Sequence, residues 1–251
     1  MFKHQSRKQK NTLALAIFFF LGGLTLLFYT DIEKTVVTWQ MNHELDKYSE
    51  RLAEQPLDLL EKLYQEMVEY NQDLYASGQS ELKDPFSFAQ PSFDLSQFGL
   101  QENIVGYLSL PQIGIKAPIY LGASNENLDH GAAQLTYTSM PVGGDNTNTV
   151  LAGHRAKWMF WNIHKLKPGD EITLTNFRET LTYRVTETII IEPNESDKIL
   201  IKEGKDLLTL ISCNPQRDNY ERIVVYSERV NLTNNQPPAT NTATPNNSPA
   251  S

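Results

Sequence analysis

The sequence predicts an N-terminal membrane-spanning helix, then a further helical segment, and then a mainly β domain that is either a sandwich or a closed barrel. Three observations predict this order. An uncharged apolar stretch occupies residues 13–29, helical periodicity continues to about residue 75, and short β-like runs follow one another from residue 104. The net charge of −8 and the lack of a basic patch argue against a nucleic-acid partner.

The N-terminus reads as a membrane signal anchor. Residues 1–12 carry Lys3, Arg7, Lys8 and Lys10 without an acid, and residues 13–30 form the span. The positive-inside rule then places the first residues in the cytoplasm and the remainder outside the cell. A cleaved signal peptide is the alternative, but no small-x-small cleavage site follows the apolar stretch.

Residues 31–75 have the spacing of two amphipathic helices. Apolar residues recur three or four apart, as at Leu59, Leu63 and Met67, and Pro56 divides the two helices because it disfavours a helical residue before it. Residues 76–103 then lack a clear period and hold several Gly and Pro residues. Long loops of this kind often act as lids or binding loops, so we expect a lid loop here.

The β-like part extends over residues 104–230. Its expected strands are 104–110, 116–121, 148–152, 171–175, 180–185, 188–192, 207–213 and 222–230. Pro118 suggests an edge or a bulge, and short helices are expected near 126–131 and 158–166. Residues 231–251 hold Asn, Thr, Pro, Ala and Ser without core-forming residues, which predicts a disordered polar tail.

The only cysteine, Cys213, draws attention because it cannot form an intramolecular disulfide. It ends one apolar run, Arg222 begins the next, and His154 follows a third run through Gly153. Strand ends on one rim of a barrel can converge. Nucleophilic catalysis needs a reachable thiolate, a histidine that moves protons and a donor for the oxyanion, and these three residues supply those groups.

Each residue also has a plainer interpretation. A lone Cys213 is often a small buried hydrophobe, His154 a loop residue and Arg222 a surface ion-pair partner. A papain-like protease is disfavoured, because its cysteine precedes its histidine in the chain. Metal-ligand spacing and dinucleotide- or phosphate-binding glycine motifs are missing from the sequence, so neither a metal nor an organic cofactor is expected.

Several motifs together resemble one family. Residues 209–213, TLISC, are similar to the TLxTC signature of sortases, with Ser212 in place of the second threonine. Residues 150–155 resemble the histidine strand of that family, residues 213–222 its cysteine-to-arginine segment, and residues 140–146 the stretch before its histidine. The resemblance covers about Ile104 to Val230.

The resemblance implies an eight-stranded sortase-type β-barrel and a membrane-bound transpeptidase of the Gram-positive cell surface. Such an enzyme cleaves an LPxTG-type sorting signal between Thr and Gly through a thioester and transfers the acyl part to an amine. Carried over by position, Cys213 is the nucleophile, His154 donates a proton to the leaving amine, and Arg222 holds the substrate carbonyl and its oxyanion. The implied partners are LPxTG-bearing surface or pilin proteins, an acceptor amine and the cell membrane.

A finer resemblance is to the class C sortases that assemble pili. Their lid carries an Asp-Pro-aromatic triplet, which Asp84-Pro85-Phe86 matches. By this resemblance Asp84 pairs with Arg222, and Phe86 covers Cys213 until the lid opens. Two departures are a polar C-terminal tail where many class C members have a second span, and Gln134 where many relatives have histidine.

Two other functions compete with pilus polymerisation. One is a housekeeping sortase that anchors surface proteins to the cell wall. The other is a non-enzymatic surface scaffold or adhesin, in which Cys213 is buried and inert.

Overall fold

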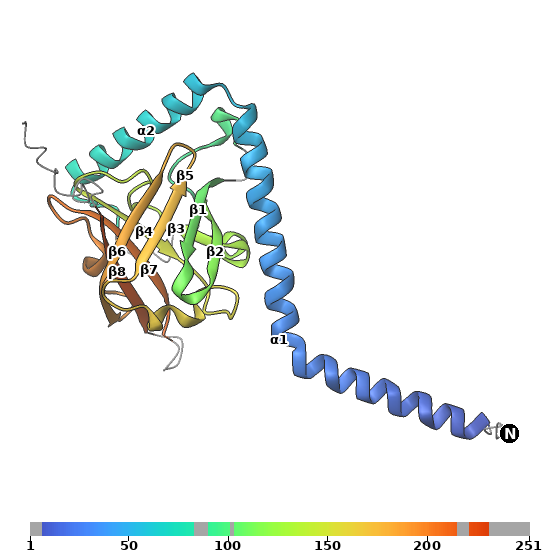
Figure 1. The fold of residues 1–251 in the computed structure, drawn as a ribbon. Coiled ribbons are helices and arrows are strands. Elements are labelled where there is room, and N and C mark those ends of the chain that lie inside the picture. Colours follow the sequence, from blue (N-terminus) through green and yellow to red (C-terminus); the bar gives the residue numbers. More distant parts are fainter. Residues whose placement is uncertain (1–6, 83–89, 101–102, 215–220, 231–251) are drawn as a thin grey trace, which may run out of the picture.

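The computed structural model describes residues 7–82, 90–100, 103–214 and 221–230. A long N-terminal helix reaches away from a β-barrel, and a second helix lies across one end of that barrel (Figure 1). The triplet with Asp84 and Phe86 and the C-terminal tail both lie outside the described residues.

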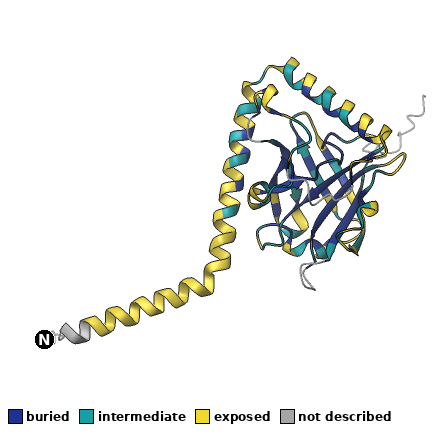
Figure 2. Cartoon of the chain, turned by 180° about the vertical axis from the view of Figure 1, so that it is seen from behind, coloured by how far each residue is buried: buried dark blue, intermediate teal, exposed yellow. Residues whose placement is uncertain are grey.

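The first helix, α1 (Arg7–Glu54), continues from the apolar stretch into the predicted amphipathic segment. In the described part of the chain, it is the one helix long and apolar enough to cross a membrane, and none of its most apolar stretch is buried. Figure 2 shows that part exposed, with buried positions beginning where α1 reaches the barrel. There Met41, Leu45 and Tyr48 are buried.

The second helix, α2 (Leu57–Ala76), begins directly after Pro56, as the sequence predicts. It buries Leu63, Met67, Asn71 and Leu74. The Asn71 side chain binds both backbone groups of one residue: its amide donates to the Met140 carbonyl at 3.2 Å, and its oxygen accepts from the Met140 N–H at 2.6 Å. A buried amide that satisfies both groups fixes α2 to the barrel.

The described strands close into an eight-stranded barrel, which confirms the predicted fold class and decides between barrel and sandwich. Their order is β1-β2-β3-β4-β7-β8-β6-β5, with parallel pairing in β2/β3 and β4/β7. The bounds are β1 Ile104–Leu110, β2 Ile115–Leu121, β3 Ala132–Gln134, β4 Thr147–Ala152, β5 Glu171–Asn176, β6 Thr180–Ile191, β7 Asp206–Cys213 and β8 Arg222–Arg229.

The strand predictions were wrong in two places. β3 was not predicted, because a three-residue strand is too short to show alternation. The runs 180–185 and 188–192 form the single strand β6, which continues through a shift in its register with β8 between Val185 and Glu187. Pro118 lies within β2, where β3 pairs only with Ile119–Leu121, so the missing N–H interrupts no bond to β3.

Short helices complete the fold. The expected helices near 126–131 and 158–166 correspond to α3 (Asn125–His130) and the 3-10 helix η3 (Phe160–Lys165). The predicted loop 76–103 contains η1 (Ser96–Phe98), and η2 (Pro111–Ile113) and η4 (Ser196–Ile199) lie between strands.

Apolar side chains cover both faces of β4, β7 and β8. One face joins the main core, to which Leu151, Leu210 and Val225 belong. The opposite face carries a smaller group, here called the second apolar cluster, whose members are Leu82, Leu135, Val150, Ala152, Ile191, Ile199, Ile211, Val224 and Tyr226. Successive side chains of a strand point to opposite faces. A residue two positions from a member of this cluster in the same strand therefore lies on the same face as the cluster.

Candidate active site

Cys213 and Arg222 lie directly opposite each other in neighbouring strands. Cys213 is the last residue of β7, Arg222 is the first of β8, and the antiparallel register pairs them. The ladder extends one step further, because the Asn214 N–H donates to the Glu221 carbonyl at 2.9 Å. Strand pairing therefore holds the thiol and the guanidinium-bearing residue at one rim of the barrel.

His154 reaches the same rim from β4. This strand runs parallel to β7 with Ala152 opposite Ile211, and the Gly153 N–H donates to the Ile211 carbonyl at 3.1 Å. The Ser212 hydroxyl also donates to the Gly153 carbonyl at 2.8 Å. Two bonds from β7 thus fix the residue before His154 beside the end of the strand that carries Cys213.

Gly153 is required here for space. A Cβ at this position would lie 2.5 Å from Cδ2 of the Phe160 ring, and that ring is only 1% exposed. The Phe160 N–H donates to the His154 carbonyl at 3.0 Å, which ties η3 to the same turn. The chain therefore packs its buried phenylalanine against the bare backbone that positions His154.

The three predicted site residues share one face of the barrel. These residues occupy alternate positions along the chain: Val150 and Ala152 precede His154, Ile211 precedes Cys213, and Val224 follows Arg222. Their strand neighbours all belong to the second apolar cluster. A polar rim with a thiol thus borders an apolar strip formed by Val150, Ala152, Ile211 and Val224.

Cys213 and His154 open into one pocket of about 310 Å³, which is also lined by Glu33, Arg155, Ala156 and Trp158. The Cys213 residue is half-buried and is a free thiol. Arg222 does not line this pocket and joins Cys213 through the strand register. Cys213 is therefore not fully buried, unlike the small buried hydrophobe of the plainer interpretation, and it shares its pocket with His154.

Two acidic residues near His154 were not predicted. Asp129 of α3 places Oδ1 3.3 Å from Nε2 of His154, with side chains 65% and 40% exposed respectively. Glu33 reaches the pocket from α1. Neither stands in a motif with His154 along the chain, so only the packing of α3 and α1 on the barrel could reveal them.

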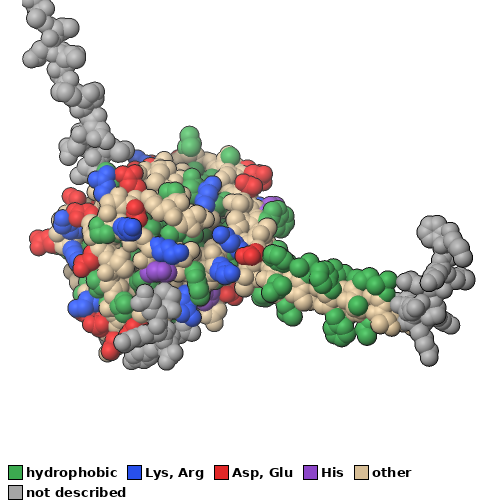
Figure 3. All heavy atoms as spheres, turned by 60° about the horizontal axis from the view of Figure 1, so that its bottom comes forward, with side chains coloured by type: hydrophobic (Ala, Val, Ile, Leu, Met, Phe, Trp, Pro, Cys, Tyr) green, Lys and Arg blue, Asp and Glu red, His purple; other side chains and the backbone are tan. Residues whose placement is uncertain are grey.

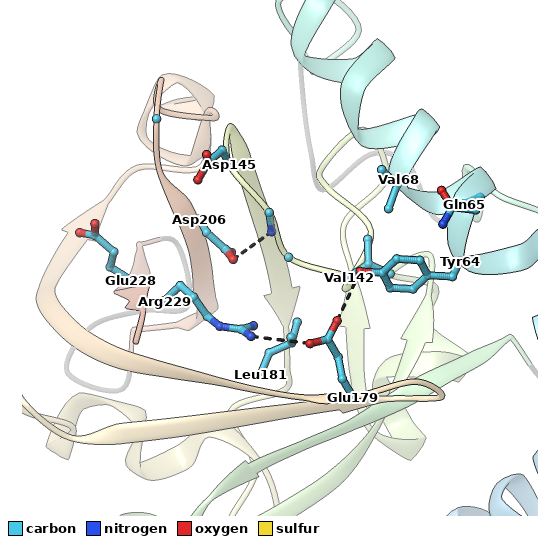
Figure 4. Close-up of a pocket in the computed structure, with 13 residues that line it drawn as sticks. Tyr64, Gln65, Val68, Val142, Asp145, Glu179, Leu181, Asp206, Glu228 and Arg229 are labelled. Carbon is cyan, nitrogen blue, oxygen red and sulfur yellow. Dashed lines mark hydrogen bonds and ion pairs between the residues drawn. The ribbon is translucent and has the colours of Figure 1, made fainter. Parts of the chain in front are cut away.

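A larger cavity of about 570 Å³ lies at the opposite ends of β7 and β8, beneath α2. Figure 4 shows Tyr64 and Arg229 both directed at Glu179, with distances of 3.3 and 3.8 Å to its carboxylate. Asp206 accepts hydrogen bonds from the Gly144 N–H and the Tyr183 hydroxyl, both at 2.9 Å. Burial raises the pKa of the Asp206 carboxyl above its ordinary value.

This larger cavity contains neither cysteine nor histidine, and its polar groups largely bind one another. Within the described ranges, no group of three or more His, Cys, Asp or Glu residues is arranged to hold a metal ion. The smaller pocket, which both Cys213 and His154 line, is therefore the candidate active site.

The chain matches known proteins over the same region. The family model "Sortase domain" matches residues 108–230. Among solved structures, sortase C from Clostridium perfringens is 32% identical with a TM-score of 0.65, and the match covers 76% of this chain and 99% of that one. Sortase C from Streptococcus pneumoniae is 30% identical with a TM-score of 0.67, and the match covers 75% and 97% of the two chains.

Three curated relatives carry the name sortase A. That of Streptococcus agalactiae is 26% identical over 223 residues, which covers 85% of this chain and 82% of the relative. That of Listeria monocytogenes is 33% identical over 132 residues, which covers 51% and 57%. The curated names and the names of the solved structures differ in subclass and agree on the family. The chain belongs to the sortase family, is a cysteine transpeptidase, and has the fold of the pilus-related class C sortases.

Proposed function

We propose that this protein is a membrane-anchored pilus-assembly sortase that cleaves an LPxTG-type signal between Thr and Gly and transfers the acyl part to a pilin lysine. The observation that carries the proposal is the direct pairing of Cys213 with Arg222, with His154 and Cys213 in one pocket. Support for the subclass comes from the sortase C structures, one of which contains a C-terminal cell-wall sorting motif.

In the first half-reaction, the Cys213 thiolate attacks the threonine carbonyl of the signal. The tetrahedral oxyanion is stabilised by the Arg222 guanidinium, whose planar N–H donors suit an anionic oxygen. The Thr–Gly C–N bond then breaks as His154 donates a proton to the departing glycine amine. The products are an acyl thioester on Cys213 and a free C-terminal fragment.

In the second half-reaction, a neutral lysine amine attacks the thioester carbonyl. An amide bond forms, the C–S bond breaks, and the proton lost by the amine passes to His154. Cys213 leaves as a thiolate, which restores the starting state. The second apolar cluster beside Cys213 offers a surface of matching chemistry for the aliphatic part of the signal.

The lid role of Asp84 and Phe86 remains part of this proposal. Residues 83–89 lie outside the described part of the chain, but both described flanks contact the barrel. Leu82 belongs to the second apolar cluster, and the Gln90 carbonyl accepts from the Thr136 hydroxyl at 2.6 Å. These contacts support a lid over the face that bears Cys213.

The test of the chemistry uses an LPxTG peptide, an amine acceptor and mass spectrometry. The wild type should give the transpeptidation product and, without acceptor, a covalent adduct on Cys213. Cys213→Ala should give neither, whereas the control Ser109→Ala, on β1 and only partly buried, should keep the adduct because only Cys213 supplies the nucleophile. Unchanged turnover by Cys213→Ala would end the assignment.

The lid is tested by thiol labelling. Asp84→Ala or Phe86→Ala should increase the alkylation rate of Cys213, because either change uncovers the thiol. Labelling at the wild-type rate in both variants would remove the lid from the proposal and leave the transpeptidase chemistry intact.

Cell-wall anchoring is the second candidate, favoured by the sortase A names of the curated relatives. Competition between a pilin-derived lysine peptide and a cell-wall precursor amine for the same thioester distinguishes the two. Faster transfer to the lysine peptide supports pilus assembly, and faster transfer to the precursor supports anchoring.

A further inference from the structure

A short basic and aromatic segment, which the sequence alone did not mark as a basic patch, stands out in this acidic chain. Residues 155–167, here called the basic-aromatic segment, read RAKWMFWNIHKLK and contain no Asp or Glu, although the whole chain has a net charge of −8. The segment includes η3 and lies next to His154. A local excess of positive charge in a chain of negative net charge favours binding of an anionic partner.

The segment has an inner and an outer side. Phe160, Ile163 and Leu166 are buried and hold η3 on the barrel. Lys157, Lys165 and Lys167 are exposed, and Trp161 is 40% exposed. Packing on the barrel therefore explains the apolar residues of the inner side. It does not explain the lysines and Trp161, which lie on the outer surface.

Trp161 is held in place on that surface. The Arg155 guanidinium carbon lies 5.5 Å from the centroid of its ring, within cation–π distance. A tryptophan flanked by cations has an apolar body and a polar ring nitrogen, the chemistry found at membrane–water interfaces. A nearby carboxylate, Glu33, belongs to α1 and lines the pocket that Arg155 also lines.

The segment also lies where α1 emerges from its apolar stretch. The Lys157 ammonium donates to the hydroxyl of Thr30 at 2.8 Å, and Thr30 directly follows the apolar residues 13–29. Figure 3 shows Lys and Arg side chains, with Asp or Glu among them, between the base of the exposed apolar helix and the middle of that face. Through Lys157 the segment thus contacts the end of the candidate membrane span.

We propose that the basic-aromatic segment docks on the anionic phospholipid headgroups of the membrane in which α1 is anchored. Its lysines match the headgroup charge, and Trp161 matches the interfacial layer. Because Arg155, Ala156 and Trp158 line the Cys213 pocket, docking holds that pocket at the bilayer surface. The inference rests on the proposed membrane anchoring by α1.

The experiment uses the full chain in vesicles of phosphatidylcholine, with and without phosphatidylglycerol, containing a lipid whose headgroup region carries a fluorescence quencher. The difference in quenching between wild type and Trp161→Phe isolates the Trp161 signal. Lys157→Gln, Lys165→Gln and Lys167→Gln are combined in one variant. A matched control combines Lys62→Gln, Lys202→Gln and Lys205→Gln, which remove equal charge from other surfaces.

Trp161 should be quenched more in vesicles that contain phosphatidylglycerol. Each lysine at an anionic surface contributes roughly five-fold, so the segment variant should lower the ratio of docked to undocked protein by about 100-fold, while the control variant stays near wild type. Equal quenching with and without phosphatidylglycerol, or an equal loss in the control, overturns the inference. Shielding of Trp161 from an aqueous quencher without lipid quenching also overturns it, and in this assay indicates contact with a second copy of the chain.

Anchoring is measured separately by extraction of the same vesicles at alkaline pH. If the chain stays with the lipid and Trp161 is not quenched, docking alone is wrong. If the chain is extracted, the proposed anchoring is wrong and the docking inference falls with it.

Discussion

The substitution Gly153→Ala tests how the fold places His154. The added Cβ would lie 2.5 Å from Cδ2 and 2.7 Å from Cε2 of Phe160, whose ring is buried and cannot swing into solvent. The Phe160 N–H also donates to the His154 carbonyl at 3.0 Å. Relief of the clash must therefore move either the ring or the backbone that carries the imidazole.

The size of the effect follows from these distances. Ordinary contact begins at 3.4 Å, so the ring and the new methyl must separate by about 1 Å. Overpacking of a dense core costs about 1–3 kcal/mol in the free energy of unfolding. A misplacement of about 1 Å at a catalytic group lowers the rate by about 100-fold. We expect both losses, with kcat affected more than KM.

The assay combines denaturant unfolding with turnover of an LPxTG peptide and alkylation of Cys213. Gly22→Ala is the control, since apart from its chain neighbours and the nearby backbone of its own helix no described atom lies within 4 Å of the added Cβ. The double variant with Phe160→Leu should recover part of the stability and of kcat, because the smaller side chain makes room. Wild-type stability and turnover in Gly153→Ala would refute the proposed positioning of His154.

Three further predictions concern single side chains. The raised pKa of Asp206 means that its contribution to the free energy of unfolding is greatest at low pH and declines as pH rises through the folded-state pKa. The stability of wild type relative to Asp206→Asn should fall in urea titrations as the pH rises above the ordinary pKa of an aspartate, about 4, and a rise would contradict this sign. Asn71→Leu removes both bonds to Met140 and should lower the free energy of unfolding by about 2 kcal/mol; a change under about 0.5 kcal/mol would show that α2 does not depend on them. Arg222→Lys keeps the charge and loses the planar fork, so kcat/KM for the peptide should fall by at least about ten-fold with an unchanged melting temperature, and full activity would leave only the charge as necessary.

Most strands could be predicted because each leaves a local pattern of alternating or continuous apolar residues. The runs at 104–110 and 207–213 match β1 and β7 within one residue. β3 escaped detection because it holds three residues and pairs in parallel with β2, a contact set by tertiary packing. β6 was divided because its register shift interrupts the alternation between Val185 and Glu187.

The candidate site was predictable to the extent that its residues stand in linear motifs. Cys213, His154 and Arg222 each lie next to a strand end that the sequence reveals. Asp129 and Glu33 do not, because α3 and α1 approach the pocket from other parts of the chain. The basic-aromatic segment is visible in the sequence, but its position beside Thr30 is not.

By itself, the sequence determined the class of fold, the order of its segments, the family and the three residues proposed to act on the substrate. These depend on local pattern and on motif spacing along one chain. Only the tertiary structure decided that β4 and β7 run in parallel, that Gly153 packs on Phe160, and that Glu33 of α1 lines the pocket of Cys213. Such features depend on contacts between residues far apart in the chain, where burial and hydrogen-bond geometry of the whole fold determine the partner.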